Sequence, residues 1–238
     1  MTKPRRRRIR PLDAWKGIRA LLRDPDDTRQ VFKIVDALSG RAGERIFRRF
    51  RATASGTRVL AEQRDLLQTL CQRDALAALP PGSLGRSYLD FVTREQITAD
   101  GLVAASQEAR EQVEELGADY RRTMERLRDM HDLWHVVSGY GRDLVGEASL
   151  LTFTFAQTWN PGVGFIAAVA YLRIGDVPGA RGLLREAFGR GRRAAWLPGE
   201  DWEALLALPL DEVRSRLRVG RPPRYEGVRS TGAPTLAY

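Results

Sequence analysis

Two histidines carry the most specific chemistry in this sequence. His131 and His135 are the only histidines among 238 residues, and Asp132 stands between them. Because a helix advances about 100° per residue, the two imidazoles come within about 40° of each other, and Asp132 lies about 60° from His135. Two imidazole nitrogens and a carboxylate are good ligands for zinc, iron or manganese. The spacing therefore predicts a divalent metal site on one helix face.

A second helix is expected to complete this site. Glu147 follows His135 with eleven residues between them. Three glycines break the helical pattern in this interval: Gly139, Gly141 and Gly146. We expect the chain to turn here and to present the Glu147 carboxylate from the next helix. The alternative is that these polar groups make ordinary helix contacts, but their neighbours are apolar and buried polar groups need partners.

The composition is that of a folded protein without a membrane-spanning segment. A chain of 238 residues with 43% hydrophobic residues can bury one sizeable core. The most apolar stretch, residues 150–172, is interrupted by polar residues and Pro161, so it falls short of the roughly 20 apolar residues that a spanning helix needs. Cys71 is the single cysteine, which excludes an internal disulfide bond. The basic start is not followed by an apolar signal segment, so we expect a cytoplasmic protein.

Positive charge is concentrated at the N-terminal end. Residues 1–58 hold 17 Lys and Arg against 6 Asp and Glu, a net charge of +11, whereas residues 59–238 hold 22 against 24, a net charge of −2. The basic groups are residues 3–8 and the set Arg45, Arg48, Arg49 and Arg51. We favour contact with an anionic membrane surface, at about 1 kcal/mol per basic residue, over a merely solvated face and over nucleic acid.

Apolar residues recur at intervals of three and four along the chain, and no stretch alternates as a half-buried strand would. Helical patterns occur at 15–22, 31–38, 58–70, 86–96, 118–137, 145–159, 164–173, 177–190, 202–206 and 211–217. The sequence therefore predicts an all-α fold. We expect a single compact multi-helix domain over residues 12–220, with the metal site between two helices. The basic start (1–11) and the Pro-rich end (221–238) are expected to be unpacked tails.

Five aromatic residues follow Glu147 within the apolar stretch: Phe153, Phe155, Trp159, Phe165 and Tyr171. They could line a groove for a long hydrophobic ligand beside the metal. Such a pair of helices is more often simply core, so both interpretations stay open from the residues alone. The segment Pro81-Gly82-Ser83-Leu84-Gly85 leads into a helix, and it lacks the glycines and the Lys-Ser/Thr of a phosphate-binding loop.

Three motifs of this sequence occur together in one known family. They are His131-Asp132-x-x-His135 followed by Glu147, Pro81-Gly82-Ser83-Leu84-Gly85-x-x-Tyr88, and Asp27-Thr28-Arg29-Gln30-Val31-Phe32. In this combination the sequence resembles the coenzyme Q (ubiquinone) biosynthesis protein 4 homologue family, and a bacterial member in particular. The first motif is specific and the other two support it. The likeness extends over residues 12–219 and leaves out both tails.

The resemblance implies an all-helical, peripheral membrane protein on the inner face of the cytoplasmic membrane. The ligands of a divalent metal, iron or zinc, would be His131, Asp132, His135 and Glu147, with Asp132 and Glu147 as the catalytic groups. Family members are associated with oxidative decarboxylation at ring carbon 1 of a polyprenylated hydroxybenzoate. The expected partners are this quinone precursor, the anionic membrane surface, other ubiquinone-biosynthesis proteins and a second copy of the chain, but not nucleic acid.

A catalyst and a scaffold remain as alternatives. Oxygen-using decarboxylation favours iron, because two histidines with a carboxylate form a common non-haem iron set and zinc has no redox chemistry. Bound zinc would favour a non-catalytic scaffold that binds lipid and metal. With either metal, Asp132 could orient a metal-bound imidazole instead of acting as a ligand. A zinc peptidase is disfavoured because Asp132 stands where a glutamate base would follow the first histidine. A phosphohydrolase built on scattered histidines would need more than two.

Overall fold

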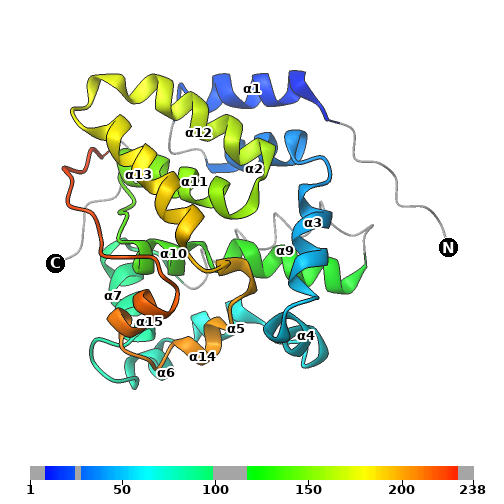
Figure 1. The fold of residues 1–238 in the computed structure, drawn as a ribbon, viewed down its shortest axis with the longest axis vertical. Coiled ribbons are helices and arrows are strands. Elements are labelled where there is room, and N and C mark those ends of the chain that lie inside the picture. The colour runs from blue at the N-terminus through cyan, green and yellow to red at the C-terminus, as the bar shows by residue number, and fades with distance from the viewer. Residues whose placement is uncertain (1–8, 25–27, 99–116, 230–238) are drawn as a thin grey trace. The chain divides into compact units, whose positions relative to one another are not determined.

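The computed structural model describes residues 9–24, 28–98 and 117–229, and over these ranges the fold is all-α, as predicted (Figure 1). The α-helices are α1 (Pro11–Leu21), α2 (Thr28–Leu38), α3 (Ala42–Phe50), α4 (Ala54–Ala61), α5 (Leu66–Cys71), α6 (Arg73–Ala77), α7 (Leu84–Arg94), α9 (Ala118–Asp129), α10 (His131–Ser138), α11 (Leu144–Thr158), α12 (Pro161–Arg173), α13 (Ala180–Arg193), α14 (Trp202–Leu205) and α15 (Leu210–Arg216). None of the helices in this part of the chain is both long enough and apolar enough to cross a bilayer. Residues 1–8 and 230–238 of the expected tails, and Asp27 of the third motif, lie outside the described residues.

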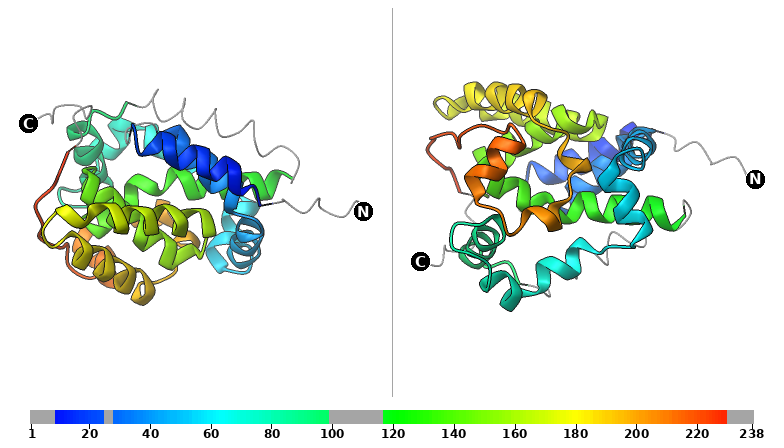
Figure 2. Two further views of the ribbon diagram at one scale, coloured as in Figure 1. Left: turned by 90° about the horizontal axis from the view of Figure 1, so that it is seen from above. Right: turned by 60° about the horizontal axis from the view of Figure 1, so that its bottom comes forward.

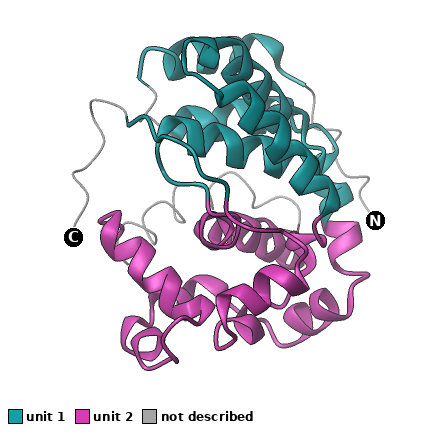
Figure 3. Cartoon of the chain, turned by 60° about the vertical axis from the view of Figure 1, so that its left-hand side comes forward, with its two compact units in different colours: residues 1–46, 140–193, 223–233 teal, residues 47–139, 194–222, 234–238 magenta. Residues whose placement is uncertain are grey.

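The contacts of the chain divide it into two compact units (Figure 3). Unit 1 comprises Met1–Ile46, Tyr140–Arg193 and Pro223–Ala233, and unit 2 comprises Phe47–Gly139, Ala194–Pro222 and Pro234–Tyr238. The described chain passes from one unit to the other after residues 46, 139, 193 and 222. Neither unit is therefore a continuous stretch of sequence. The helical region therefore has no boundary in sequence at which it separates into two domains.

Unit 1 is a set of packed helices that begins with α1. This helix packs against α2, α2 packs against α12, and α11 packs against both α12 and α13 (Figures 1 and 2). Buried aliphatic residues join α1, α2 and α12: Ala14, Ile18, Ile34, Ala37 and Ile166. Gly17 permits the close approach of α1 to α2, because a Cβ atom there would lie 2.7 Å from Ile34 Cγ1. α1 is thus fixed to unit 1 by its inner face.

Unit 2 contains α10 and the helices that contact it. α10 packs against α7, α9 and α15. A backbone hydrogen bond of 2.8 Å from the Gly85 amide to the Leu206 carbonyl fixes the start of α7. Ser83 caps this helix, because its Oγ atom accepts a hydrogen bond from the Arg86 amide at 3.3 Å. The Pro-Gly-Ser-Leu-Gly segment is therefore a helix start that positions α7 beside α10.

Two stretches predicted as single helices are each divided into two. The stretch 58–70 is α4 and α5, separated at Gln63, whose backbone is left-handed with φ of 51°. Asp65 then starts α5 by accepting a hydrogen bond from the Gln68 amide at 3.1 Å. The stretch 118–137 is α9 and α10, which meet at Met130. Both single-helix predictions are wrong, because glutamine and methionine have no intrinsic preference for ending a helix.

Part of the C-terminal tail is packed within unit 1. The Tyr225 hydroxyl donates a hydrogen bond to Asp143 Oδ2 at 2.8 Å and accepts one from the Gly141 amide at 2.7 Å. The Val228 amide donates to Asp143 Oδ1 at 3.2 Å. The expectation of an unpacked tail is therefore corrected for this segment, because the buried Asp143 carboxylate takes its hydrogen-bond donors from it.

Gly139 ends α10 in a left-handed conformation close to Pro222. Its φ of +78° favours glycine, and a Cβ atom there would lie 2.4 Å from Pro222 Cβ. We expect Gly139→Ala to lower the free energy of unfolding by about 2–4 kcal/mol, because left-handed strain adds to a steric clash. Urea unfolding of the variant measures this loss.

Gly82→Ala is the matched control for this substitution. Gly82 has a similar φ of +76°, but nothing lies within 4 Å of an added Cβ atom. The control should therefore lose only about 1–2 kcal/mol, from backbone strain alone. Equal losses in the two variants would rule out a contribution from the clash with Pro222.

Candidate metal and lipid sites

The residues of the first motif come together on α10. His131 is the first residue of this helix, and His135 lies one turn later. One ligand atom from each of His131, Asp132 and His135 lies within 4.8 Å of the other two. The imidazole centroids are 4.7 Å apart, and His131 Nδ1 is 3.4 Å from Asp132 Oδ1. The predicted shared helix face is confirmed, and we call these three residues the His-Asp-His cluster.

Exposure decreases from one end of the cluster to the other. The His131 side chain is 45% exposed and that of Asp132 is 13% exposed, whereas His135 is only 1% exposed. Water or a ligand therefore reaches the cluster from the His131 side. At the His135 end, the low local dielectric strengthens any interaction with a charged group.

Neighbouring helices hold α10 in position. The Phe91 ring of α7 is stacked on the His135 ring, with centroids 5.5 Å apart and planes inclined by 22°. Arg214 of α15 donates hydrogen bonds to the carbonyls of Val136 and Val137, both at 3.1 Å. These carbonyls belong to the last turn of α10, where a helix leaves acceptors unsatisfied. The His135 ring and the end of its helix are therefore both fixed.

Tyr88 is a residue of this region that the sequence does not connect with the histidines. It lies on α7, one turn before Phe91, and is fully buried. Its hydroxyl has no hydrogen-bond partner among the described residues. Burial raises the pKa of the Tyr88 phenol well above its usual value, and the charge of Asp132 raises it further. The hydroxyl therefore stays protonated, as a donor within electrostatic reach of the cluster.

A buried acid precedes the cluster in the chain. Burial raises the pKa of Asp129 to about 6, although Arg128 lowers it by its charge and by a hydrogen bond. The Arg128 Nη2 atom is 2.8 Å from Asp129 Oδ1. Above that pH, Asp129 adds negative charge beside α10, which favours a bound cation.

Glu147 lies on the helix after α10, as predicted. Asp143 starts this helix, α11, because its Oδ1 atom accepts a hydrogen bond from the Gly146 amide at 3.1 Å. Glu147 is in the first turn of α11, and its Oε1 atom is 3.7 Å from Arg142 Nε. It belongs to unit 1, whereas the His-Asp-His cluster belongs to unit 2. A fourth metal ligand from Glu147 therefore stays a prediction.

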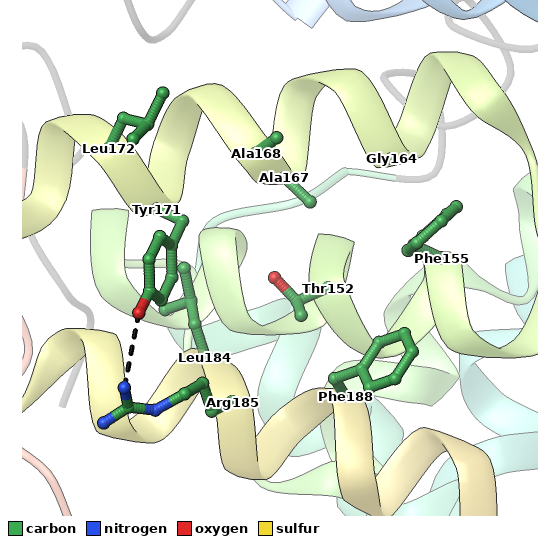
Figure 4. Close-up of a pocket in the computed structure, with 10 residues that line it drawn as sticks. All are labelled: Thr152, Phe155, Gly164, Ala167, Ala168, Tyr171, Leu172, Leu184, Arg185 and Phe188. Carbon is green, nitrogen blue, oxygen red and sulfur yellow. Dashed lines mark hydrogen bonds between the residues drawn. The ribbon is translucent and has the colours of Figure 1, made fainter.

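Unit 1 contains an apolar pocket between α11, α12 and α13 (Figure 4). Its volume is about 500 Å³, which is in the range of small-molecule sites. The lining residues are Thr152, Phe155, Gly164, Ala167, Ala168, Tyr171, Leu172, Leu184, Arg185 and Phe188. Figure 4 shows Tyr171 and Arg185 at one end, where Arg185 Nη1 donates to the Tyr171 hydroxyl at 3.4 Å, and the two phenylalanines at the other. The pocket thus suits an elongated apolar group with a polar end.

The structure separates the five aromatic residues predicted to line a lipid groove. Phe155 and Tyr171 line the pocket. Phe153 is fully buried, and Phe165 packs against the core shared by α1, α2 and α12, so both are corrected to core positions. Trp159 is 49% exposed and is not among the lining residues. The physical reason is helical geometry, since residues two apart, such as Phe153 and Phe155, point about 160° apart.

Small residues on α12 shape the pocket and were not singled out from the sequence. Gly164, Ala167 and Ala168 lie three and four apart, so they share one helix face. A Cβ atom at Gly164 would lie 2.6 Å from Phe155 Cε2. This run of small residues is the sequence signal that could have indicated the pocket side of α12.

One protein family matches the chain over most of its length. The family described as Coenzyme Q (ubiquinone) biosynthesis protein Coq4 matches residues 11–223. The chain belongs to this family. The Coq4 family is involved in ubiquinone biosynthesis, so the resemblance drawn from the three motifs is confirmed.

Similar proteins of the Coq4 family come from fungi. The chain is 29% identical over 198 residues to the mitochondrial ubiquinone biosynthesis protein coq4 of Schizosaccharomyces japonicus, and the match covers 80% of each chain. It is 27% identical over 179 residues to the Neosartorya fischeri protein of the same name, covering 74% of this chain and 60% of that protein. A crystal structure from Nostoc punctiforme has a TM-score of 0.60 and 22% identity, covering 89% of this chain and 99% of that one. This last likeness concerns the fold alone.

Proposed function

We propose that this Coq4 family member replaces the carboxylate at ring carbon 1 of a polyprenylated hydroxybenzoate by a hydroxyl, at a membrane surface. The carboxyl carbon leaves as carbon dioxide, molecular oxygen supplies the hydroxyl oxygen, and a two-electron reductant converts the second oxygen atom to water. The observation that carries this proposal is the His-Asp-His cluster on α10, in a chain whose family serves ubiquinone biosynthesis. A cluster that is open at His131 and buried at His135 suits the binding and orientation of a charged aromatic ring.

The donor set of the cluster fits a divalent metal. Two imidazole nitrogens and a carboxylate oxygen within 4.8 Å of one another are three ligands that can meet at one ion. Bound there, iron would supply electron exchange with oxygen, whereas zinc would supply only Lewis-acid polarisation. Asp132 serves either as the third ligand or to orient the His131 imidazole, since these side chains are 3.4 Å apart.

Residues of α7 supply the other functions that the proposed reaction needs. The protonated Tyr88 hydroxyl lies within electrostatic reach of Asp132, so it acts as a buried neutral dipole that supports the charge of the cluster. The Phe91 ring holds the His135 ring by stacking and keeps water from the buried end of the cluster. Both side chains are fixed before substrate binds, because α7 packs against α10.

The apolar pocket of unit 1 is proposed to hold an isoprenoid chain. Its lining is apolar apart from Thr152, Tyr171 and Arg185, so burial of an isoprenoid is favoured by about 25 cal/mol per Å² of apolar surface. The same pocket supports the alternative function, a non-catalytic scaffold that binds lipid and organises the other ubiquinone-biosynthesis proteins. Among the described residues, its lining contains no carboxylate or imidazole that could act on a bound lipid.

The proposed location is peripheral, on the inner face of the cytoplasmic membrane. The motivation is the net charge of +11 in residues 1–58, since anionic lipid attracts basic segments. A precursor with a long polyprenyl chain stays in the bilayer, so an enzyme that acts on its ring must meet it at the surface.

A labelled-precursor experiment tests catalysis against scaffolding. In a strain without its own Coq4 homologue, the wild-type chain should convert a ring-labelled hydroxybenzoate to ubiquinone. Glu147→Gln keeps the side-chain volume but removes the charge, and Tyr88→Phe removes only the hydroxyl. Each variant should lower the rate of labelled ubiquinone formation about tenfold or more, and the carboxylated intermediate should accumulate.

Glu226→Gln serves as the control, because this exposed acid of unit 1 lies outside both sites. This variant should form labelled ubiquinone at the wild-type rate. Full ubiquinone production by folded Glu147→Gln and Tyr88→Phe variants would reject the catalytic proposal and leave the scaffold.

A further inference from the structure

The outer face of α1 exposes large apolar side chains to water. Leu12 is 75% exposed, Trp15 58% and Leu22 42%. With Arg19 they stand three and four residues apart, so they form one line along the helix, which we call the α1 stripe. The opposite face, with Ile18, is buried in the core of unit 1. α1 is therefore apolar on both sides, and core packing accounts for only one of them.

The same outer side of α1 is basic. Lys16, Arg19 and Arg23 are exposed, and no ion pair joins them to the described residues. The acid of this helix, Asp13, is 3.3 Å from Arg10 Nε and is neutralised by it. The α1 stripe thus combines exposed apolar side chains with uncompensated positive charge.

We propose that α1 docks unit 1 on an anionic lipid bilayer, with the α1 stripe entering the headgroup region. A helix that lies in the membrane interface has this composition, with Trp and Leu entering the lipid and Lys and Arg beside them. Tryptophan favours the headgroup level, and long basic side chains extend their apolar stems while their charges reach lipid phosphates. The sequence before α1 adds five basic residues at positions 3–8.

Charge also argues against a second copy of the chain as the partner that covers the α1 stripe. Contact between two α1 stripes would bring Lys16, Arg19 and Arg23 of one copy against those of the other, and such like-charge contacts are unfavourable. Anionic lipid is complementary to this face in both its charge and its apolar character. This inference rests on the proposed membrane location and names the surface that makes the contact.

The position of α12 connects this surface with the pocket of unit 1. Ile166 on one side of α12 is buried against α1 and α2, whereas Ala167 and Gly164 on another side line the pocket. Docking through α1 therefore places lipid against unit 1 on the far side of the α1, α2 and α12 core from the apolar pocket, with α12 shared by the core and the pocket. An anchor here would hold unit 1 at the membrane that contains its proposed isoprenoid ligand.

Trp159 is another exposed tryptophan of unit 1 that could contact a membrane, and it is 49% exposed. Its surroundings differ from those of Trp15, because the basic groups near it are already engaged. The Arg192 guanidinium lies 5.3 Å from the centre of the Trp159 ring, and Arg45 donates a hydrogen bond of 3.0 Å to the Trp159 carbonyl. Trp159 is therefore the matched control for Trp15.

Co-sedimentation of the full chain with vesicles tests the proposal. The vesicles are phosphatidylcholine alone and phosphatidylcholine mixed with phosphatidylglycerol. The double variant Leu12→Ser, Trp15→Ser should bind the anionic vesicles about tenfold more weakly than the wild-type chain. The triple variant Lys16→Gln, Arg19→Gln, Arg23→Gln should bind the anionic vesicles on the order of a hundredfold more weakly, because each lost charge lowers the affinity about fivefold. All these side chains are exposed, so thermal unfolding should stay as in wild type, and Trp159→Ser should keep wild-type binding.

Three results would overturn the assignment. Wild-type binding by both α1 variants would reject α1 as the anchor while leaving the membrane location in place. Loss of binding only in Trp159→Ser would move the anchor to that residue. A wild-type chain that binds neither vesicle would reject the membrane location and α1 together, and α1 would then be tested against an acidic protein partner.

Discussion

The double variant His131→Ala, His135→Ala should bind divalent metal at least about a hundredfold more weakly than the wild-type chain. Loss of a residue that only orients a metal ligand costs about 10–100-fold in affinity, so loss of two ligands costs more. The three-residue cluster would retain a single donor, Asp132. Elemental analysis of the purified proteins measures the difference.

Two further variants make this measurement specific. His131→Ala alone removes a half-exposed side chain, so it should lose metal without loss of the fold. Glu212→Gln changes an exposed acid of the same unit, whose ion pair is with the exposed Arg216, and it should keep the wild-type metal content. Equal metal in the wild type and the double variant would contradict the site, as would a wild-type chain that contains none when purified without chelators.

The identity of the metal separates the two proposed functions. Near-stoichiometric iron that disappears in the double variant favours oxygen-using decarboxylation, because iron exchanges electrons. Zinc at the same residues favours a scaffold or a Lewis-acid role, because it has no redox chemistry.

The His-Asp-His cluster could be predicted from sequence because all its geometry lies within one helix. The spacing of His131 and His135 fixes their relative direction wherever α10 lies in the fold. The same holds for the break at Gly139, where the sequence itself marks the end of a helix. Local rules are sufficient for both features.

Tyr88 could not be connected with the cluster, since its relation to Asp132 arises from the packing of α7 against α10. The motif that contains Tyr88 indicates a helix start, and Ser83 confirms that role. The distance in sequence between Tyr88 and His131 contains no information about their proximity. Only the tertiary structure brings them into one region.

The lipid groove stays a prediction, but the pocket of unit 1 contains only two of the five aromatic residues named for that groove, Phe155 and Tyr171. Apolar residues occur on all sides of α11 and α12, so hydrophobic periodicity does not identify which face is core. Phe153 and Phe165 face the core, and Phe155 and Tyr171 face the pocket. The choice between the faces is made by the helices packed on either side.

Arg126→Ala should lower the free energy of unfolding by about 3–5 kcal/mol, because it leaves a buried charge without its partner. Arg126 of α9 is 3% exposed, and its two Nη atoms donate to both carboxylate oxygens of Glu203 on α14, at 2.7 and 2.6 Å. Glu203 is itself only 15% exposed. Urea unfolding measures the loss, with the slope of the transition as a check that the folded state is unchanged.

This ion pair also bears on the candidate metal site. α9 continues into α10 through Met130, so the bond from Arg126 to Glu203 fixes the helix that leads into His131. Arg126→Ala should therefore weaken metal binding, although the residue is not a ligand. The conservative variant Arg126→Lys retains the charge but not the two-pronged geometry, and it should fall between wild type and alanine in both measurements.

A double variant identifies the source of the penalty. Arg126→Met, Glu203→Leu removes both charges at similar volume and should recover most of the stability, because the cost of the single variant lies in the unpaired Glu203 carboxylate. Arg216→Ala breaks an exposed pair with Glu212, whose side chains are 56% and 43% exposed, and should cost no more than about 1 kcal/mol. If the double variant is as unstable as Arg126→Ala, the loss comes from packing of the arginine stem. If the double variant recovers stability but not metal affinity, the Arg126–Glu203 ion pair is needed to position α10 and not to stabilise the fold.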